Sequence, residues 1–133
     1  MPAIPAPLRD LVQARAGNRC EYCQLHQDDD QFFRFHVEHV VARQHDGATA
    51  EGNLALSCHH CNLHKGPNLT GLDPLTGDIT PLYHPRKQIW AEHFEWRGVA
   101  IVGLTPTGRA TVRVLSMNAP NRLELRSVAG RGG

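Results

Sequence analysis

The sequence lacks long hydrophobic runs. No segment approaches the roughly 18 consecutive apolar residues that a membrane span needs, so we expect no contact with a membrane. Residues 1–8 also lack the basic segment and apolar stretch of a secretory signal. The sequence therefore predicts a protein of the cytoplasm, a compartment in which cysteines remain reduced.

The chain also lacks a strong excess of charge of one sign. Its 14 Lys and Arg residues nearly balance 13 Asp and Glu, which gives a formal net charge of +1. Four cysteine thiolates around one zinc ion would change this value to about −1. Residues 62–133 hold nine Lys and Arg against five Asp and Glu, whereas residues 1–61 hold five against eight. We therefore expect a polyanion to meet mainly the second half of the chain, helped by any bound cation.

The size and the hydrophobic pattern predict one compact domain, residues 1–133, of the α+β class. Of the 133 residues, 41% are hydrophobic, which suits a single core of modest size. Apolar residues alternate from Phe33 to Val37, which indicates a half-buried strand with His36 and Glu38 on its polar face. The other elements expected before residue 67 are a helix at 7–17, a strand at 54–56 and a helix at 58–65.

Four cysteines form two Cys-x-x-Cys pairs, Cys20 with Cys23 and Cys58 with Cys61. Two residues between the members of a pair let one tight turn present both sulfurs to a single ion, and two such turns complete a tetrahedral site. Redox-active or disulfide-bonded cysteines are the alternative, but this spacing favours structural Zn²⁺. The pairs are separated by 34 residues, whereas plain zinc ribbons have roughly 15 to 20. The sequence therefore predicts that another unit lies between them.

Three short blocks occupy that unit and its end: residues 37–40 (VEHV), 53–56 (NLAL) and 58–66 (CHHCNLHKG). Together with the cysteine pairs, they resemble the HNH endonuclease family over residues 20–66. The resemblance implies a β-β-α metal finger, held by a four-cysteine zinc site, that hydrolyses phosphodiester bonds of nucleic acid. Residues 67–128 would add a helix and a β-hairpin, and residues 129–133 would form a disordered tail.

The resemblance also implies roles for single residues. His39 would be the general base that activates water, and Asn53 would brace the loop that orients it. Glu38 and Asn62 would hold one divalent cation, Mg²⁺ or Mn²⁺, with Ni²⁺ or Ca²⁺ as alternatives. This is the HNN variant, because asparagine occupies position 62 where the name-giving motif has histidine, and glutamate stands where aspartate is common. His64 cannot replace Asn62, since two helical positions differ by roughly 200° of rotation.

Candidate phosphate contacts complete the predicted site: His36, His64 and Lys65. A surface histidine without a role is an equally good interpretation of His36. We expect DNA as the partner, although no residue distinguishes it from RNA, and the sequence does not indicate an oligomeric state. The alternative function is a non-catalytic zinc module that binds nucleic acid, which would give no purpose to the Glu-His pair or the second asparagine.

Beyond residue 67 the patterns indicate structure rather than chemistry. Residues 86–94 have one apolar, aromatic side and predict a helix that covers the finger. Alternating apolar residues predict a hairpin of strands at 96–104 and 109–115, joined by a turn at 105–108. A last short helix is expected at 118–123, before the tail.

Overall fold

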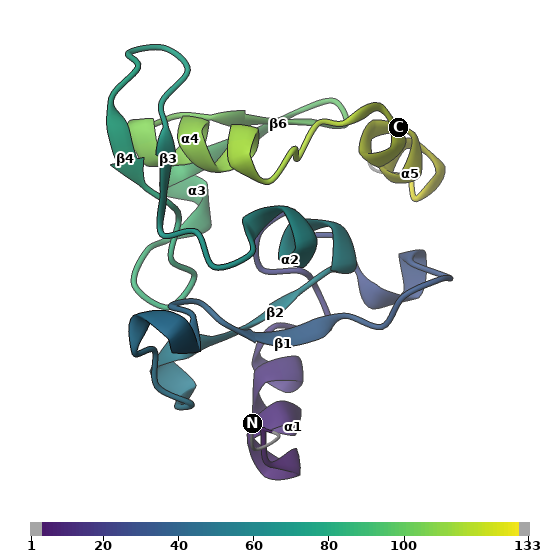
Figure 1. Ribbon diagram of the computed structural model, residues 1–133. Helices are drawn as coiled ribbons and strands as arrows, with labels where there is room; N and C mark the ends of the chain where they lie inside the picture. The colour runs from purple at the N-terminus through teal and green to yellow at the C-terminus, as the bar shows by residue number, and fades with distance from the viewer. Residues whose placement is uncertain (1–3, 131–133) are drawn as a thin grey trace.

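Three two-stranded antiparallel sheets and five α-helices alternate along residues 4–130, the part of the chain that the computed structural model describes (Figure 1). In chain order these elements are α1 (Ala6–Arg15), β1 (His36–His39), β2 (Leu54–Ser57), α2 (His59–Lys65), β3 (Thr70–Leu72), β4 (Ile79–Pro81), α3 (Trp90–His93), β5 (Phe94–Arg97), β6 (Ala100–Gly103), α4 (Pro106–Val114) and α5 (Pro120–Val128). The α+β prediction is confirmed. Within residues 4–130, no helix has both the length and the apolar character that a membrane span requires.

The finger consists of β1, β2 and α2. The two strands pair antiparallel, with His36 opposite Ser57 and His39 opposite Leu54. Helix α2 and helix α1 lie on opposite sides of this sheet (Figure 1). The predicted second strand and the helix after it are confirmed, and that helix ends at Gly66, whose φ of 51° suits glycine. Residues far apart in the sequence thus meet where α2 packs on β1.

The first strand is shorter than predicted, because the residues before it use side chains as hydrogen-bond partners. Asp30 Oδ1 accepts from the backbone N–H groups of Phe32 and Phe33, both at 3.0 Å. Gln27 Oε1 accepts from the N–H group of Phe35 at 2.7 Å. These donors are therefore not available to a neighbouring strand, and β1 begins only at His36.

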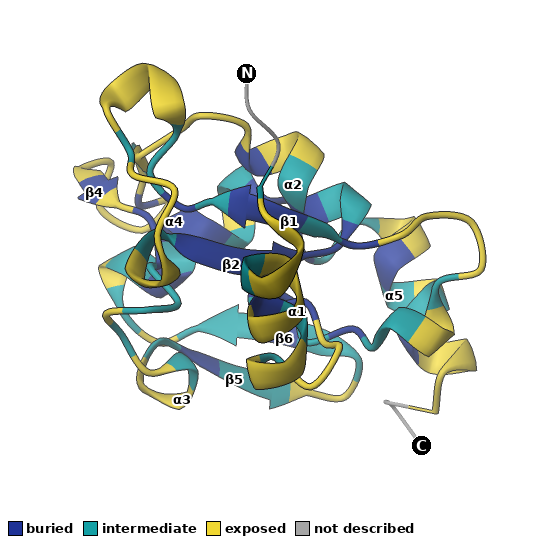
Figure 2. Cartoon of the chain, turned by 90° about the horizontal axis from the view of Figure 1, so that it is seen from below, coloured by how far each residue is buried: buried dark blue, intermediate teal, exposed yellow. Residues whose placement is uncertain are grey.

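One connected core joins the finger to the residues that follow it. Trp90 Nε1 donates to the carbonyl of Tyr22 at 2.7 Å, and Arg86 pairs with Glu21. In Figure 2 the finger strands are largely buried, whereas α1 is mostly exposed. The buried hydrophobic residues of this core include Tyr22, Leu54, Leu56, Tyr83, Phe94, Ile101, Leu115 and Met117.

The predicted helix at 86–94 is reduced to the four residues of α3. The side chains of two residues in the preceding turn explain this difference. His84 Nδ1 accepts from the N–H group of Arg86 at 3.2 Å, and Gln88 Oε1 accepts from the N–H group of His84 at 2.9 Å. These contacts stabilise a turn in place of a first helical turn. Trp90 reaches the turn before the finger, where its Nε1 donates to the carbonyl of Tyr22.

The predicted hairpin at 96–104 and 109–115 is wrong. The actual hairpin consists of β5 and β6, with Gly98 in its turn at a φ of 59°, and residues 106–114 form helix α4. Thr105 caps this helix, since its Oγ1 accepts from the N–H group of Gly108 at 3.0 Å. A Cβ atom on Gly108 would overlap with the backbone of His93, so the helix begins in close contact with its neighbours. The segment 105–108 is therefore a helix start, and Pro106 is its first residue.

Arg109, Arg122 and Arg126, three of the nine basic residues in the second half, are buried or paired within the protein. Arg122 and Arg126 are only 8% and 4% exposed. Arg109 Nη2 lies 2.8 Å from Oδ2 of the buried Asp73, and this guanidinium lowers the pKa of Asp73 to about 2. Buried and paired in this way, these cations stabilise the fold and do not meet a polyanion.

The last helix is longer than predicted, since α5 extends to Val128. The N–H group of Ala129 still donates to the carbonyl of Leu125 at 2.9 Å, so helical hydrogen bonding reaches the first residue of the predicted tail. The rest of that prediction, from residue 131 onward, lies outside the described residues.

Candidate active site and metal centre

The four cysteines converge from two segments, the turn that precedes the finger and the beginning of α2. Their sulfur atoms all lie within 4.8 Å of one another, and Sγ of Cys23 is 3.7 Å from Sγ of Cys58. A tetrahedral zinc ion with bonds of about 2.3 Å would separate its sulfurs by about 3.8 Å. All four residues are at most 1% exposed, and none forms a disulfide. The donor set therefore fits structural zinc.

The groups around these sulfurs suit a negatively charged cluster. The N–H groups of Cys23 and Cys61 donate to Sγ of Cys20 and Cys58, each at 3.4 Å. Nη2 of the buried Arg122 also lies 3.4 Å from Cys58 Sγ. Four thiolates and one Zn²⁺ carry two net negative charges, which this guanidinium partly offsets. Burial raises the pKa of the Cys20 thiol, so metal binding must supply the free energy that removes its proton.

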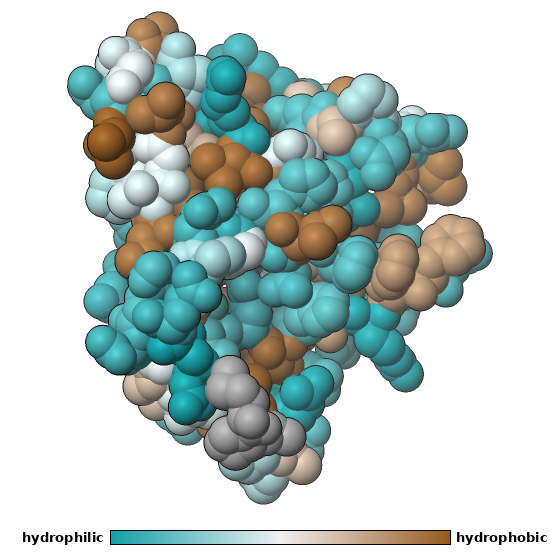
Figure 3. Space-filling model, in the orientation of Figure 1, coloured by the Kyte–Doolittle hydropathy of each residue, from teal (hydrophilic) through white to brown (hydrophobic). Residues whose placement is uncertain are grey.

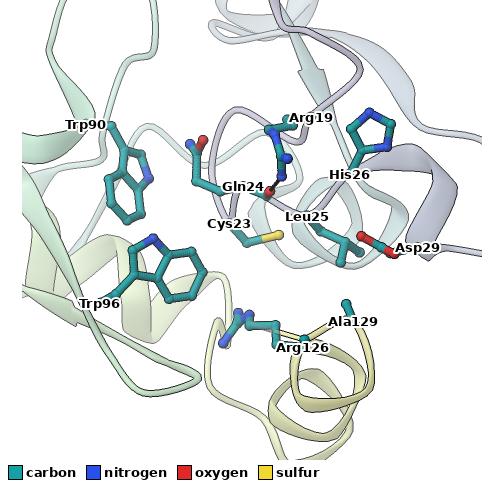
Figure 4. Close-up of a pocket in the computed structure, with 11 residues that line it drawn as sticks. Arg19, Cys23, Gln24, Leu25, His26, Asp29, Trp90, Trp96, Arg126 and Ala129 are labelled. Atoms are coloured by element: carbon teal, nitrogen blue, oxygen red, sulfur yellow. Dashed lines mark hydrogen bonds between the residues drawn. The ribbon is translucent and has the colours of Figure 1, made fainter. Parts of the chain in front are cut away.

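A cavity of about 480 Å³ lies beside this cluster (Figure 4). The rings of Trp90 and Trp96 line it with centroids 5.8 Å apart, and Cζ of Arg126 lies 5.7 Å from the Trp96 centroid. Arg126 also donates to the carbonyls of Val99 and Met117, which fixes its position. No residue of the Glu-His pair contributes to this cavity, so it lies apart from the predicted catalytic residues.

Glu38 is buried in β1 with an incomplete set of hydrogen bonds. Its Oε1 atom and the hydroxyl of Tyr22 are inaccessible to solvent, and neither has a hydrogen-bond partner of ordinary geometry within residues 4–130. Burial raises the pKa of Glu38 to about 7, although Lys65 and Tyr22 oppose the shift. A bound cation would supply the missing partner of a buried carboxylate oxygen and favour its ionised form. Glu38 therefore fits a divalent cation ligand.

His39 ends β1, and a neighbouring loop holds its ring. Its Nε2 lies 2.8 Å from Thr49 Oγ1, and Arg43 Nη1 donates to the same oxygen at 3.0 Å. A hydroxyl oxygen that accepts both of these bonds requires the ring proton on Nε2, which leaves Nδ1 able to take a proton. Burial lowers the pKa of His39, and Arg43 lowers it further. The imidazole is therefore neutral at pH 7, as a general base must be.

Asn53 fixes the loop between β1 and β2 from its far end. Its Oδ1 accepts from the N–H group of Val41 at 2.8 Å, and its Nδ2 donates to the carbonyls of Val41 and Ala48, both at 2.9 Å. Within this loop, a Cβ atom on Gly47 would overlap with the carbonyl oxygen of Val41. The loop that begins just after His39 is thus held closed by one asparagine and one close glycine contact.

Glu38, His39 and Asn62 line one open cavity of about 450 Å³, together with Arg43 and Gly66. Asn62 projects from α2, whereas the Glu-His pair ends the strand on which α2 packs. The packing of this helix on this strand thus brings a carboxylate, an imidazole, an amide and a guanidinium to one surface. Oxygen ligands, a neutral base and a cation around one hollow are groups that metal-assisted hydrolysis of a phosphodiester can use.

Residues 20–68 match the family model described as HNH endonuclease. These residues form an HNH endonuclease domain. The match covers all four zinc-site cysteines and every residue of the Glu-His-Asn cavity named above. Among curated proteins and solved structures, no significant match to the chain was found. Membership of residues 20–68 in this family implies a nuclease that uses metal.

One predicted phosphate contact of the HNH domain requires correction. Lys65 is only 2% exposed, and its Nζ donates to the carbonyl of Val40 at 2.8 Å. Burial lowers the pKa of Lys65, while Glu38 raises it. Lys65 therefore positions the chain beside the Glu-His pair from within the core and does not reach a phosphate at the surface.

The two predicted histidine contacts belong to different elements, His36 to β1 and His64 to α2. His64 is exposed, but its Nδ1 contacts the carbonyl of His60 at 2.8 Å and it does not line the cavity. His36 shares the strand with Glu38, and its Nε2 lies 3.2 Å from His59 Nδ1. Neither His36 nor His64 lines the cavity of Glu38, His39 and Asn62.

Arg43 and Thr49 are site residues that sequence reasoning did not identify. They lie in the polar loop that the sequence indicates only as a connection, four and ten residues after His39. A loop residue that contacts a histidine across such a distance leaves no periodic pattern. Only the folded loop, closed by Asn53, brings these side chains to the base.

Proposed function

We propose that the chain is a divalent-metal-dependent endonuclease that hydrolyses phosphodiester bonds of DNA. The observation that carries this proposal is the shared cavity of Glu38, His39 and Asn62. The buried carboxylate there has one oxygen without a hydrogen bond of ordinary geometry within residues 4–130, and burial lowers the pKa of the neighbouring imidazole. The HNH domain makes nucleic acid the expected class of substrate.

Glu38 and Asn62 would hold the cation through a carboxylate and an amide oxygen. Hard oxygen ligands favour Mg²⁺ or Mn²⁺, which would stabilise the negative charge on the phosphate and on the departing oxygen. Lys65 lies close enough to Glu38 to favour its ionised form, and so prepares it as a ligand.

His39 would take the proton of the attacking water at Nδ1, while Thr49 holds the ring through Nε2. The water oxygen forms a bond to phosphorus as the opposite P–O bond breaks, and the departing oxygen receives a proton from solvent. Arg43 faces the same cavity and would neutralise charge on the phosphate. Asn53 would keep the loop of Arg43 and Thr49 in place.

Thr49→Val is expected to lower the single-turnover cleavage rate about tenfold without a comparable loss of DNA affinity. Valine keeps the shape but removes the oxygen that meets both His39 and Arg43, so the imidazole loses its orientation. Thr49→Ser, which keeps the hydroxyl, is the matched control and should retain nearly all of the rate. Equal rates for the valine and serine variants would contradict this role.

Glu38→Gln and Asn62→Ala are expected to raise the Mn²⁺ concentration needed for half-maximal cleavage at least tenfold, because each removes an oxygen or a charge that the ion needs. The measurement is cleavage of labelled duplex DNA and of an RNA of the same sequence, titrated with Mn²⁺. His64→Ala serves as the control, since this exposed residue lies away from the cavity. A cation requirement that is unchanged in both variants would refute the assignment of the metal ligands.

A further inference from the structure

Two phenylalanines of the finger are exposed on a loop that is otherwise well ordered. Phe32 is 87% exposed and Phe33 is 50% exposed. Their exposure does not come from a lack of structure in the loop. Asp30 Oδ1 accepts from the N–H groups of both phenylalanines, and Gln27 Nε2 donates to the Phe33 carbonyl at 3.0 Å. These bonds hold the backbone of both phenylalanines while their rings are exposed to water.

The Phe33 ring belongs to an aromatic row that continues onto the finger. The ring of Phe33 stacks on that of His59, with centroids 4.1 Å apart and planes 9° apart. His59 in turn lies beside His36, with centroids 5.5 Å apart and a distance of 3.2 Å between Nδ1 and Nε2. The row is therefore built from the loop, from the first residue of α2 and from the first residue of β1.

The row points along the finger toward the candidate active site. His36 and Glu38 are two residues apart on the same side of β1, a separation of about 7 Å. His59 and Asn62 are three residues apart on one side of α2, a rise of about 4.5 Å. The aromatic row and the cavity thus occupy neighbouring positions along the same strand and the same helix, at about the spacing of adjacent nucleotides.

Charge around the row favours an uncharged base over a phosphate at the phenylalanines. Phe32 and Phe33 line a groove with Asp28 and Asp29, whose exposed carboxylates repel phosphates. Arg34, by contrast, is exposed at the next position along the chain. A DNA strand can therefore place a phosphate near Arg34 while one of its bases lies on the phenylalanine rings.

We propose that Phe32 and Phe33 form a stacking platform for an unpaired base next to the nucleotide that is cut. This inference rests on the proposed nuclease function and extends it, because it names single-stranded or locally unpaired DNA as the preferred substrate class. Every base has a flat face that can stack on an aromatic side chain, so the platform needs no particular sequence. A base within an intact duplex is stacked on its neighbours and cannot use it.

Binding to a fluorescent single-stranded oligonucleotide tests the platform, measured in a His39→Ala background so that the strand stays intact. Phe32→Ala with Phe33→Ala is expected to weaken this affinity at least tenfold and to change the affinity for blunt duplex less than twofold. Phe32→Ala alone, at an exposed position, should reproduce part of the loss, and Phe32→Trp should retain the affinity. The matched control is Leu75→Ala with Ile79→Ala, which removes exposed apolar side chains from the β3–β4 region, where hydrophobic residues also gather (Figure 3).

Unchanged affinity for the single strand, or an equal loss for single strand and duplex, would overturn the platform. Loss of self-association in place of DNA affinity would assign the rings to a protein contact and would also overturn it. Because binding is measured without cleavage, these outcomes are separate from the fate of the nuclease proposal. That proposal fails if the native protein does not cut in the presence of Mg²⁺ or Mn²⁺, whatever the phenylalanine variants bind.

Discussion

Replacing His39 with alanine is expected to lower the single-turnover rate of DNA cleavage by about 10²- to 10⁴-fold, the usual contribution of a general base. No other histidine lines the cavity within the described residues, so no neighbouring imidazole can take over the proton. DNA affinity should change less than twofold, because the proposed cation site and Arg43 remain. Quenched-flow cleavage of a labelled duplex and a separate binding titration measure the two quantities.

His45→Ala is the matched control for that variant. His45 is exposed in the same loop between β1 and β2, but it does not line the cavity, so its removal should leave the rate unchanged. If His39→Ala kept more than a tenth of the native rate while His45→Ala lost more, the assignment of the base would be wrong.

Removal of zinc is expected to unfold the HNH domain. The cysteines connect the turn before the finger to the start of α2, and their side chains lie within the hydrophobic core. Structural zinc sites contribute apparent binding free energies of about 10–16 kcal/mol, which equals or exceeds the net stability of about 5–15 kcal/mol of an ordinary domain. A strong chelator should therefore abolish cooperative thermal unfolding, as followed by near-ultraviolet circular dichroism.

Cys20→Ser tests the same site by removal of one ligand. We expect less than one zinc ion per chain after dialysis and a large loss of thermal stability, because three sulfurs and the buried Arg122 remain without a fully coordinated metal. Leu63→Ser, at an exposed position of α2, is the control and should keep zinc and most of the stability. If Cys20→Ser in the presence of chelator kept the melting temperature of the zinc-loaded native protein, a structural role for zinc would be contradicted.

The finger could be predicted because its signals are local and its spacing is strict. Two residues between paired cysteines fix each turn, and the apolar pattern of residues 54–56 matches β2. The Glu-His pair and Asn62 were found by motif, and the structure brings them to one cavity. Each of these inferences depends on a few neighbouring residues and not on the packing of the whole chain.

The remaining features depend on tertiary contacts that a sequence pattern does not contain. The alternating apolar residues at 109–115 suit a strand, but capping by Thr105 and the close contact at Gly108 favour a helix. The sequence presents Lys65 as a surface cation, yet its ammonium finds the carbonyl of Val40 in the core. The sequence likewise does not indicate the partner of His39, because Thr49 contacts the imidazole only when the loop between β1 and β2 is folded.

Nicking of supercoiled plasmid is the measurement that tests the central claim most directly. The zinc-loaded native protein and His39→Ala are incubated with plasmid, with and without added Mg²⁺ or Mn²⁺, after their zinc content and fold are confirmed to be equal. We predict open-circular DNA only with the native protein and only with the added cation. If neither protein cuts any DNA or RNA while both bind nucleic acid equally, the chain is a zinc-dependent binding module and not a nuclease.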